Sequence, residues 1–214
     1  MTIKSNIKYI KNRTKKAQLV IVTKHQDLKK IKQAYDTGER DFAENKVQNL
    51  IEKKELLPND IKWHMIGHLQ KNKVKIITPF IHLIQSVDSI QLLEKINYHA
   101  EKNNRIINCL IQIKIAQEEE KFGFSIQEVS EILKSNYQIQ YPYVHIIGIM
   151  GMATLTNDTN QIKKEFESIK SMLNIIKTKA PVYSIGMSQD YKIAYASGSN
   201  MIRIGSAIFK QELA

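Results

Sequence analysis

The sequence predicts one α/β domain, a (β/α)₈ barrel of the TIM type preceded by an extra N-terminal helix. Short runs rich in β-branched residues alternate with longer helical patterns from about residue 19 to the end, as in repeated βα units around a parallel sheet. Eight such runs occur within about 200 residues, which fits a closed barrel better than an open doubly wound sheet. No linker-like tract interrupts the chain, so we expect residues 1–214 to form a single domain.

The strands are predicted from short apolar or β-branched runs, in chain order. These are residues 19–24, 41–44, 63–66, 82–86, 106–115, 143–148, 182–185 and 201–204. A Rossmann-like sheet is the alternative, but it requires a Gly-x-Gly-x-x-Gly turn after the first strand. Residues 23–27 read Thr-Lys-His-Gln-Asp instead, which favours the barrel.

The helices are predicted from apolar residues at helical spacing. The first is amphipathic, with Ile3, Ile7 and Ile10 on one face. The others are residues 27–36, 46–56, 70–77, 89–103, 126–135, 158–177 and 189–196. Several open on a residue type that caps helix N-termini, namely Asp27, Ser89, Ser125 and Asp158.

Composition excludes several classes of protein. No apolar run approaches the roughly 18 residues of a membrane span, and the N-terminus lacks the apolar core of a secretory leader, so we expect a cytoplasmic protein. The single cysteine, Cys109, lies in an apolar run and reads as a buried core residue. One thiol forms neither an intrachain disulfide nor a thiolate cluster, and we expect no metal site.

The formal charge of +11 raises the question of nucleic-acid binding. Only four of the 32 basic residues are Arg, and the lysines are spread among Ile and Asn along the whole chain. A compositional bias explains this pattern at least as well as a binding surface does. We therefore do not expect nucleic acid as a partner, although an empty barrel with a basic surface remains an alternative function.

Active residues of such barrels lie at the C-terminal ends of the strands. Lys24 closes the first strand after an apolar run, where desolvation disfavours the ammonium form and the neutral amine attacks aldehydes. A lysine extending to the rim is the alternative. Residues 186–190 (Gly-Met-Ser-Gln-Asp) and 203–209 each place glycine and serine after a final strand, where barrels commonly hold a phosphate. Ordinary turns are the other interpretation.

Arg203, near the end of the last strand, is expected to face the barrel interior and needs a partner there. One candidate is the ring nitrogen of a pyridine cofactor, whose protonation a guanidinium disfavours. The other is an ion pair with an acidic residue such as Glu44.

Six segments in order resemble the pyridoxal 5′-phosphate (PLP) homeostasis proteins, the YggS/PROSC family, whose fold is similar to the N-terminal barrel of alanine racemase. The most specific are residues 63–73, Trp-His-Met-Ile-Gly-His-Leu-Gln-Lys-Asn-Lys, and residues 184–190, which contain Gly-Met-Ser-x-Asp. The other segments are residues 22–24, 38–48, 148–150 and 202–206. Together they span most of the chain.

The resemblance implies PLP as cofactor, held as a Schiff base on Lys24. It implies phosphate contacts from Ser188, Gly205 and Ser206, with Arg203 facing the pyridine nitrogen. It further implies that Asn45 lies beside the ring and that Met65 and Met150 line the pocket. His64, in the most specific segment, has no implied chemical role and reads as a core histidine with satisfied hydrogen bonds.

The sequence departs from the family pattern at two places. The family usually continues after its lysine with Thr-Lys-Pro or similar, whereas residues 25–27 read His-Gln-Asp here, and Lys46 replaces a tyrosine. The first departure puts the loop after the lysine in doubt and the second removes an aromatic ring. Neither touches Lys24 or the phosphate-binding residues.

The sequence favours a carrier over a catalyst. Alanine racemase takes a second acid/base from a separate C-terminal domain, whereas this sequence ends five residues after Phe209, and none of its nine tyrosines stands at a strand end in a matching motif. We expect a monomeric PLP-binding protein that buffers the cofactor and delivers it to PLP-dependent apo-enzymes. A PLP enzyme with weak racemase-like activity toward an amino acid is the alternative.

Overall fold

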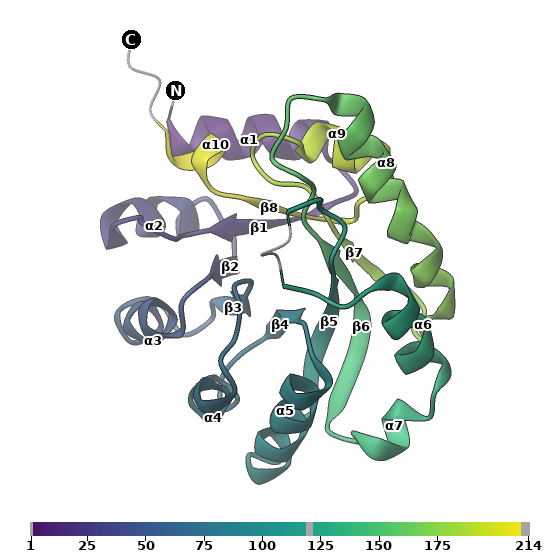
Figure 1. Cartoon of the computed structure of the whole chain (residues 1–214). Coiled ribbons are helices and arrows are strands. Elements are labelled where there is room, and N and C mark those ends of the chain that lie inside the picture. The colour runs from purple at the N-terminus through teal and green to yellow at the C-terminus, as the bar shows by residue number, and fades with distance from the viewer. Residues whose placement is uncertain (1, 119–121, 211–214) are drawn as a thin grey trace.

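Eight parallel strands close into a barrel in chain order, with β1 paired to both β2 and β8 (Figure 1). The computed structural model describes residues 2–118 and 122–210. The closing pair β1–β8 runs in register from Gln18 opposite Met201 to Ile21 opposite Ile204. The predicted barrel is confirmed. Its strands are β1 Gln18–Val22, β2 Asp41–Glu44, β3 Lys62–Met65, β4 Leu83–Val87, β5 Ile107–Ile113, β6 Val144–Gly151, β7 Val182–Ser184 and β8 Met201–Ile204.

The helices surround the strands, and α1 lies beside α10 (Figure 1). All four predicted caps accept a backbone N–H at the start of their helix: Asp27, Ser89, Ser125 and Asp158. The α-helices are α1 Ile3–Arg13, α2 Leu28–Tyr35, α3 Val47–Leu56, α4 Val74–Ile77, α5 Ile90–Lys102, α6 Ile126–Lys134, α7 Tyr137–Gln140, α8 Thr159–Ile169, α9 Tyr191–Ala196 and α10 Ser206–Phe209; the 3₁₀ segments are η1 Lys71–Lys73 and η2 Lys170–Ile175.

Several boundaries differ from the prediction; the fifth strand ends at Ile113 rather than at residue 115, and the helix expected over residues 70–77 divides into η1 and α4. The sixth strand continues to Gly151 because its pairing with β5 extends to Ile113. The first strand ends at Val22, where its pairing with β2 stops, so Lys24 lies in the following turn. The helix expected over residues 158–177 divides into α8 and the 3₁₀ segment η2, and the short helix α7 was not predicted.

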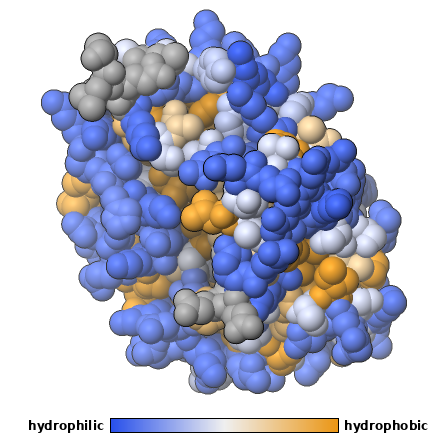
Figure 2. Space-filling view, turned by 45° about the horizontal axis from the view of Figure 1, so that its top comes forward, coloured by the Kyte–Doolittle hydropathy of each residue, from blue (hydrophilic) through white to orange (hydrophobic). Residues whose placement is uncertain are grey.

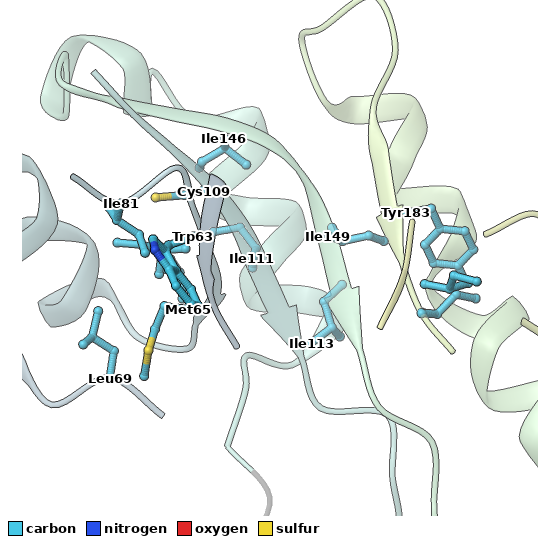
Figure 3. Packing of buried hydrophobic residues seen from close by; sticks show 14 of the residues in the cluster. Trp63, Met65, Leu69, Ile81, Cys109, Ile111, Ile113, Ile146, Ile149 and Tyr183 are labelled. Carbon is cyan, nitrogen blue, oxygen red and sulfur yellow. The ribbon is translucent and has the colours of Figure 1, made fainter. Parts of the chain in front are cut away.

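Alternation along the strands separates two apolar layers. The larger layer lies between strands and helices and includes Trp63, Ile111 and Tyr183 (Figure 3). The smaller layer fills the barrel interior with residues such as Val20 and Leu110. None of the helices in the described part of the chain has the length and apolar character needed to cross a bilayer.

The thiol of Cys109 gives a test of this packing. Cys109 is fully buried in the larger layer (Figure 3), and burial raises the pKa of its thiol far above the ordinary value. Because the thiolate is the reactive form, we expect no reaction with Ellman's reagent at pH 8 in the native protein and one equivalent after denaturation. Rapid stoichiometric labelling of the native protein would contradict this packing.

Candidate cofactor site

The predicted site residues follow the strands at one end of the barrel. Lys24 comes after β1, Asn45 after β2, Ser188 after β7, and Gly205 and Ser206 after β8. Because all strands are parallel and β8 closes onto β1, these C-terminal ends meet around a single mouth. The barrel therefore brings together residues that are far apart in the sequence.

Lys24 differs from the sequence expectation in its environment. It lies two residues beyond the end of β1 and its side chain is exposed, whereas the preceding Thr23 is fully buried. His25 next to it adopts a left-handed backbone with φ of 63°. The apolar run of β1 therefore does not desolvate the amine as expected. The amine is instead accessible to a ligand that approaches the mouth from solvent.

The two glycine–serine turns predicted separately are joined by one hydroxyl. The Ser188 Oγ accepts hydrogen bonds from the backbone N–H of Gly205 at 3.3 Å and of Ala207 at 3.2 Å. A Cβ at Gly205 would lie 3.1 Å from the Val22 carbonyl oxygen, so a side chain there would crowd β1. A hydroxyl and main-chain N–H groups gathered in one place form the donor set that a phosphate group takes.

The turn that carries Ser188 has its own requirements. Gly186 has φ of 96°, and a Cβ there would lie 2.5 Å from the Cβ of Ala194. The buried carboxylate of Asp190 closes the turn by accepting the Met187 N–H at 2.5 Å. Burial raises the pKa of Asp190, while the Met187 hydrogen bond and the Arg203 charge oppose that rise.

Arg203 faces the barrel interior, as the sequence predicts, and is 2% exposed. Its NH1 donates to the carbonyl oxygen and the Oγ of Ser184 at 2.8 and 2.6 Å, and its NH2 donates to the Gly151 carbonyl at 3.0 Å. Burial lowers the pKa of Arg203 to about 10, so the guanidinium remains a cation at neutral pH. The suggested ion pair with Glu44 is wrong, because Glu44 pairs with Lys53.

A continuous chain of hydrogen bonds crosses the barrel interior from Arg203. Ser184 Oγ donates to Gln85 Oε1 at 2.7 Å, and Gln85 Nε2 lies 2.9 Å from His64 Nδ1. His64 Nε2 lies 3.1 Å from Asp41 Oδ1. His64 is fully buried with both ring nitrogens partnered, which agrees with a satisfied core histidine.

The two methionines expected in the pocket belong to different layers. Met150 packs inside the barrel with Val20 and Val22. Met65 lies in the layer between strands and helices, near Trp63 (Figure 3). Neighbouring residues of a strand face opposite sides, and His64, next to Met65, faces the barrel interior. Met65 therefore faces the helices, and the structure does not bring it together with the other predicted site residues.

A buried ion pair supports the strand end that carries Lys24. Lys53 Nζ, from α3, donates to Glu44 Oε1 at 2.6 Å and to the Thr23 carbonyl at 2.8 Å. Thr23 Oγ1 also donates to Glu44 Oε1, at 2.5 Å. The other oxygen, Glu44 Oε2, is buried without a hydrogen-bond partner. These contacts tie α3, β2 and the end of β1 together directly before Lys24.

Sequence reasoning did not find the supporting residues Lys53, Gln85 and Ser184. Gln85 and Ser184 lie within buried strands, and a polar side chain there is the one signal that could have marked them. Lys53 gave no such signal, because a lysine on an amphipathic helix normally extends into solvent.

The chain is similar to known proteins over most of its length. The family model described as alanine racemase, N-terminal domain, matches residues 1–212. The pyridoxal phosphate homeostasis protein of Helicobacter pylori strain ATCC 700392 / 26695 is 36% identical over 196 residues, covering 91% of this chain and 87% of the relative. The protein of that name from Synechocystis sp. strain PCC 6803 is 34% identical over 208 residues, covering 92% of each.

Solved structures give the same result. PipY of Synechococcus elongatus PCC7942, with PLP bound, superposes with a TM-score of 0.87 at 27% identity, covering 98% of this chain and 100% of that one. An alanine racemase from Bartonella henselae shares the fold at 17% identity with a TM-score of 0.77. There the match covers 98% of this chain and 58% of the racemase.

The Glu44–Lys53 pair predicts a loss of stability in one variant and its recovery in another. Lys53→Met leaves the Glu44 carboxylate buried without its cation, so we expect the free energy of unfolding in urea to fall by about 3–5 kcal/mol. The double variant Glu44→Gln/Lys53→Met removes the uncompensated charge and should recover most of that loss. Lys54→Met, on the same helix, is the matched control and should change little. A Lys53→Met variant within about 1 kcal/mol of the wild type would show that the pair does not stabilise the fold.

Proposed function

The chain belongs with the pyridoxal phosphate homeostasis proteins in the alanine racemase N-terminal domain family, and we propose that it binds PLP, holds it as a Schiff base on Lys24, and buffers or delivers it. One observation carries this proposal. A reactive amine and a phosphate-type donor set, made by Ser188 with the Gly205 and Ala207 amides, follow strands that meet at one barrel mouth.

The residues present fit the phosphate group. Ser188 and the main-chain N–H groups of residues 205–207 would hold it, and the tight approach of Gly205 to Val22 keeps the β8 turn close to β1. Asn45, half-buried at the end of β2, would lie beside the ring and its 3′-oxygen. Met150 would contribute to the apolar floor from within the barrel.

Lys24 would attach the cofactor through its ε-amine. Its exposed position permits exchange with amines and with acceptor proteins from solvent. When bound, PLP supplies an aldehyde that forms reversible bonds with amines and an aromatic ring that withdraws electrons. Covalent attachment lowers the free concentration of that reactive aldehyde, which is what a buffering role requires.

Arg203 supports a carrier rather than a catalyst. It is the residue that would face the ring nitrogen, and it stays protonated at neutral pH despite its burial. A cation at this position disfavours protonation of the ring nitrogen and so weakens the cofactor as an electron sink. Arg203 is held by hydrogen bonds to Ser184 and Gly151, and the Asp190 charge opposes the lowering of its pKa by burial.

The proposed partners are PLP and PLP-dependent apo-enzymes in the cytoplasm, which would receive the cofactor. We also propose that the chain acts as a monomer. On the face shown in Figure 2, hydrophilic groups cover most of the surface and hydrophobic groups lie among them. Light scattering of the protein as it elutes from a size-exclusion column would reveal a larger assembly.

The attachment site is tested by the visible spectrum of the purified protein. We expect the absorption band of protein-bound PLP in the wild type. After reduction with borohydride, we expect a stable PLP adduct on the peptide containing Lys24. Lys24→Ala should lose both, whereas Lys46→Ala, an exposed lysine beside the same mouth, should keep both. A stoichiometric reducible adduct in Lys24→Ala would mean that another lysine is used. Turnover of an amino acid abolished by Lys24→Ala would favour an enzyme.

The phosphate site is tested by comparing PLP with pyridoxal, which lacks the phosphate. Ser188→Ala removes a donor to a charged group, a loss of roughly 1.5–3 kcal/mol. We therefore expect PLP affinity to fall about 10- to 100-fold in absorbance titrations, while pyridoxal affinity stays the same. Ser168→Ala, an exposed serine on α8, is the control. Equal losses for both ligands would show that Ser188 shapes the barrel without contacting the phosphate.

A further inference from the structure

A second group of potential ligands lies at the opposite end of the barrel from Lys24. Asp41 is the first residue of β2, His64 lies within β3, and His82 directly precedes β4. One potential ligand atom from each lies within 4.8 Å of the other two. Asp41 and His64 lie in the paired strands β2 and β3, and the His82 N–H, directly before β4, donates to the Trp63 carbonyl at 2.9 Å, so backbone hydrogen bonds fix how the three residues are spaced.

We propose that Asp41, His64 and His82 bind a divalent transition metal of the zinc class, with a fourth position open to water. His64 Nε2 and Asp41 Oδ1 are 3.1 Å apart. Zinc bonds of about 2.0–2.2 Å in tetrahedral geometry place two ligand atoms about 3.3–3.5 Å apart, so this pair needs almost no adjustment. Two imidazoles and one carboxylate are also the ligand types that such metals take.

The buried side of the group already contains an orienting partner for His64. Metal-bound histidines almost always donate their second ring N–H to an oxygen, which fixes the ring. Gln85, on β4, contacts His64 Nδ1 at 2.9 Å. Rotation of the Gln85 amide places its carbonyl oxygen against Nδ1–H and leaves the Nε2 lone pair free for the metal. Its amide nitrogen then donates to Ser184 Oγ, so Gln85 keeps its contacts with His64 and Ser184.

His82 supplies the accessible and adjustable ligand. Its side chain is exposed, and its ring centroid lies 5.4 Å from that of His64 at an angle of 47°. It makes no hydrogen bond with the described residues, so its ring can turn toward the other two without breaking one. A metal ion can therefore enter from solvent at this end without passing the cofactor mouth.

The surrounding charges restrict the kind of ion. Lys62 and Arg105 lie near the group, and Arg105 is held by the Thr78 and Ile81 carbonyls. One carboxylate beside two cations does not attract Ca²⁺ or Mg²⁺, which require several oxygen ligands. Transition metals bond to imidazole nitrogen, and their affinity for a site depends more on the type of ligand than on the net charge of the site. The group therefore selects for zinc-like ions.

The sequence expectation of no metal site rested on the lack of thiolates. The ligands proposed here come from two strands and from the residue directly before a third, with no spacing that marks them as a group in the sequence. Only the parallel register of β2, β3 and β4 places them together.

Zinc binding to the full-length protein tests the proposal. After chelator treatment and dialysis, Zn²⁺ is titrated in competition with a chromophoric chelator, and Co²⁺ is added separately as a spectroscopic probe. We expect one Zn²⁺ per chain, visible absorption from bound Co²⁺, and a rise in thermal midpoint with Zn²⁺. Mg²⁺ and Ca²⁺ should produce no rise.

Variants of two proposed ligands, with a control histidine, test whether zinc binds at this group. His82→Ala removes an exposed side chain and should weaken Zn²⁺ binding at least about tenfold and abolish the thermal shift. Asp41→Asn keeps an acceptor for His64 but loses the charge, and should also weaken binding. His99→Ala, a histidine on α5, should bind Zn²⁺ like the wild type. A wild type that binds no zinc, or a His82→Ala variant that binds like the wild type, would overturn the proposal. Neither result would affect the PLP spectrum.

Discussion

Backbone pairing between β1 and β8 is the contact on which the site depends. It joins the two ends of the chain in register and so places the turn after residue 204 beside the end of β1. Gly205 approaches Val22 so closely that a side chain there would press on the strand. Because the barrel is closed, its strands have no free edge, and the amine and the phosphate-type donors are held by the same hydrogen-bonded sheet.

Several polar side chains lie inside the barrel and hold one another by hydrogen bonds. Arg203 would be costly to bury alone, but two carbonyls and the Ser184 hydroxyl receive its hydrogen bonds. Gln85 then connects Ser184 with His64. These hydrogen bonds hold the Arg203 guanidinium in one position inside the barrel.

The two ends of the barrel serve different chemistry for a geometric reason. Parallel strands place the turns that follow them at one end and the residues that begin them at the other. Lys24 and Ser188 follow strands, whereas Asp41 begins β2 and His82 directly precedes β4. The Glu44–Lys53 pair stabilises only the first of these ends, where it anchors Thr23. A ligand at either end can therefore bind without displacing the other.

The sequence by itself determined the strand count, the helix caps and the strand-end residues, because these follow from local periodicity and from residue type. Lys24, Ser188 and Gly205 could be named in this way. Tertiary structure decided what surrounds them. In the folded chain Lys24 is exposed, and Glu44 pairs with Lys53 rather than with Arg203. Met65 and Met150 lie in different layers. Asp41 and His64, which are far apart in the sequence, are in contact. Such pairings depend on where strands end and on which side each residue faces in the closed barrel, and only the register of the sheet sets both.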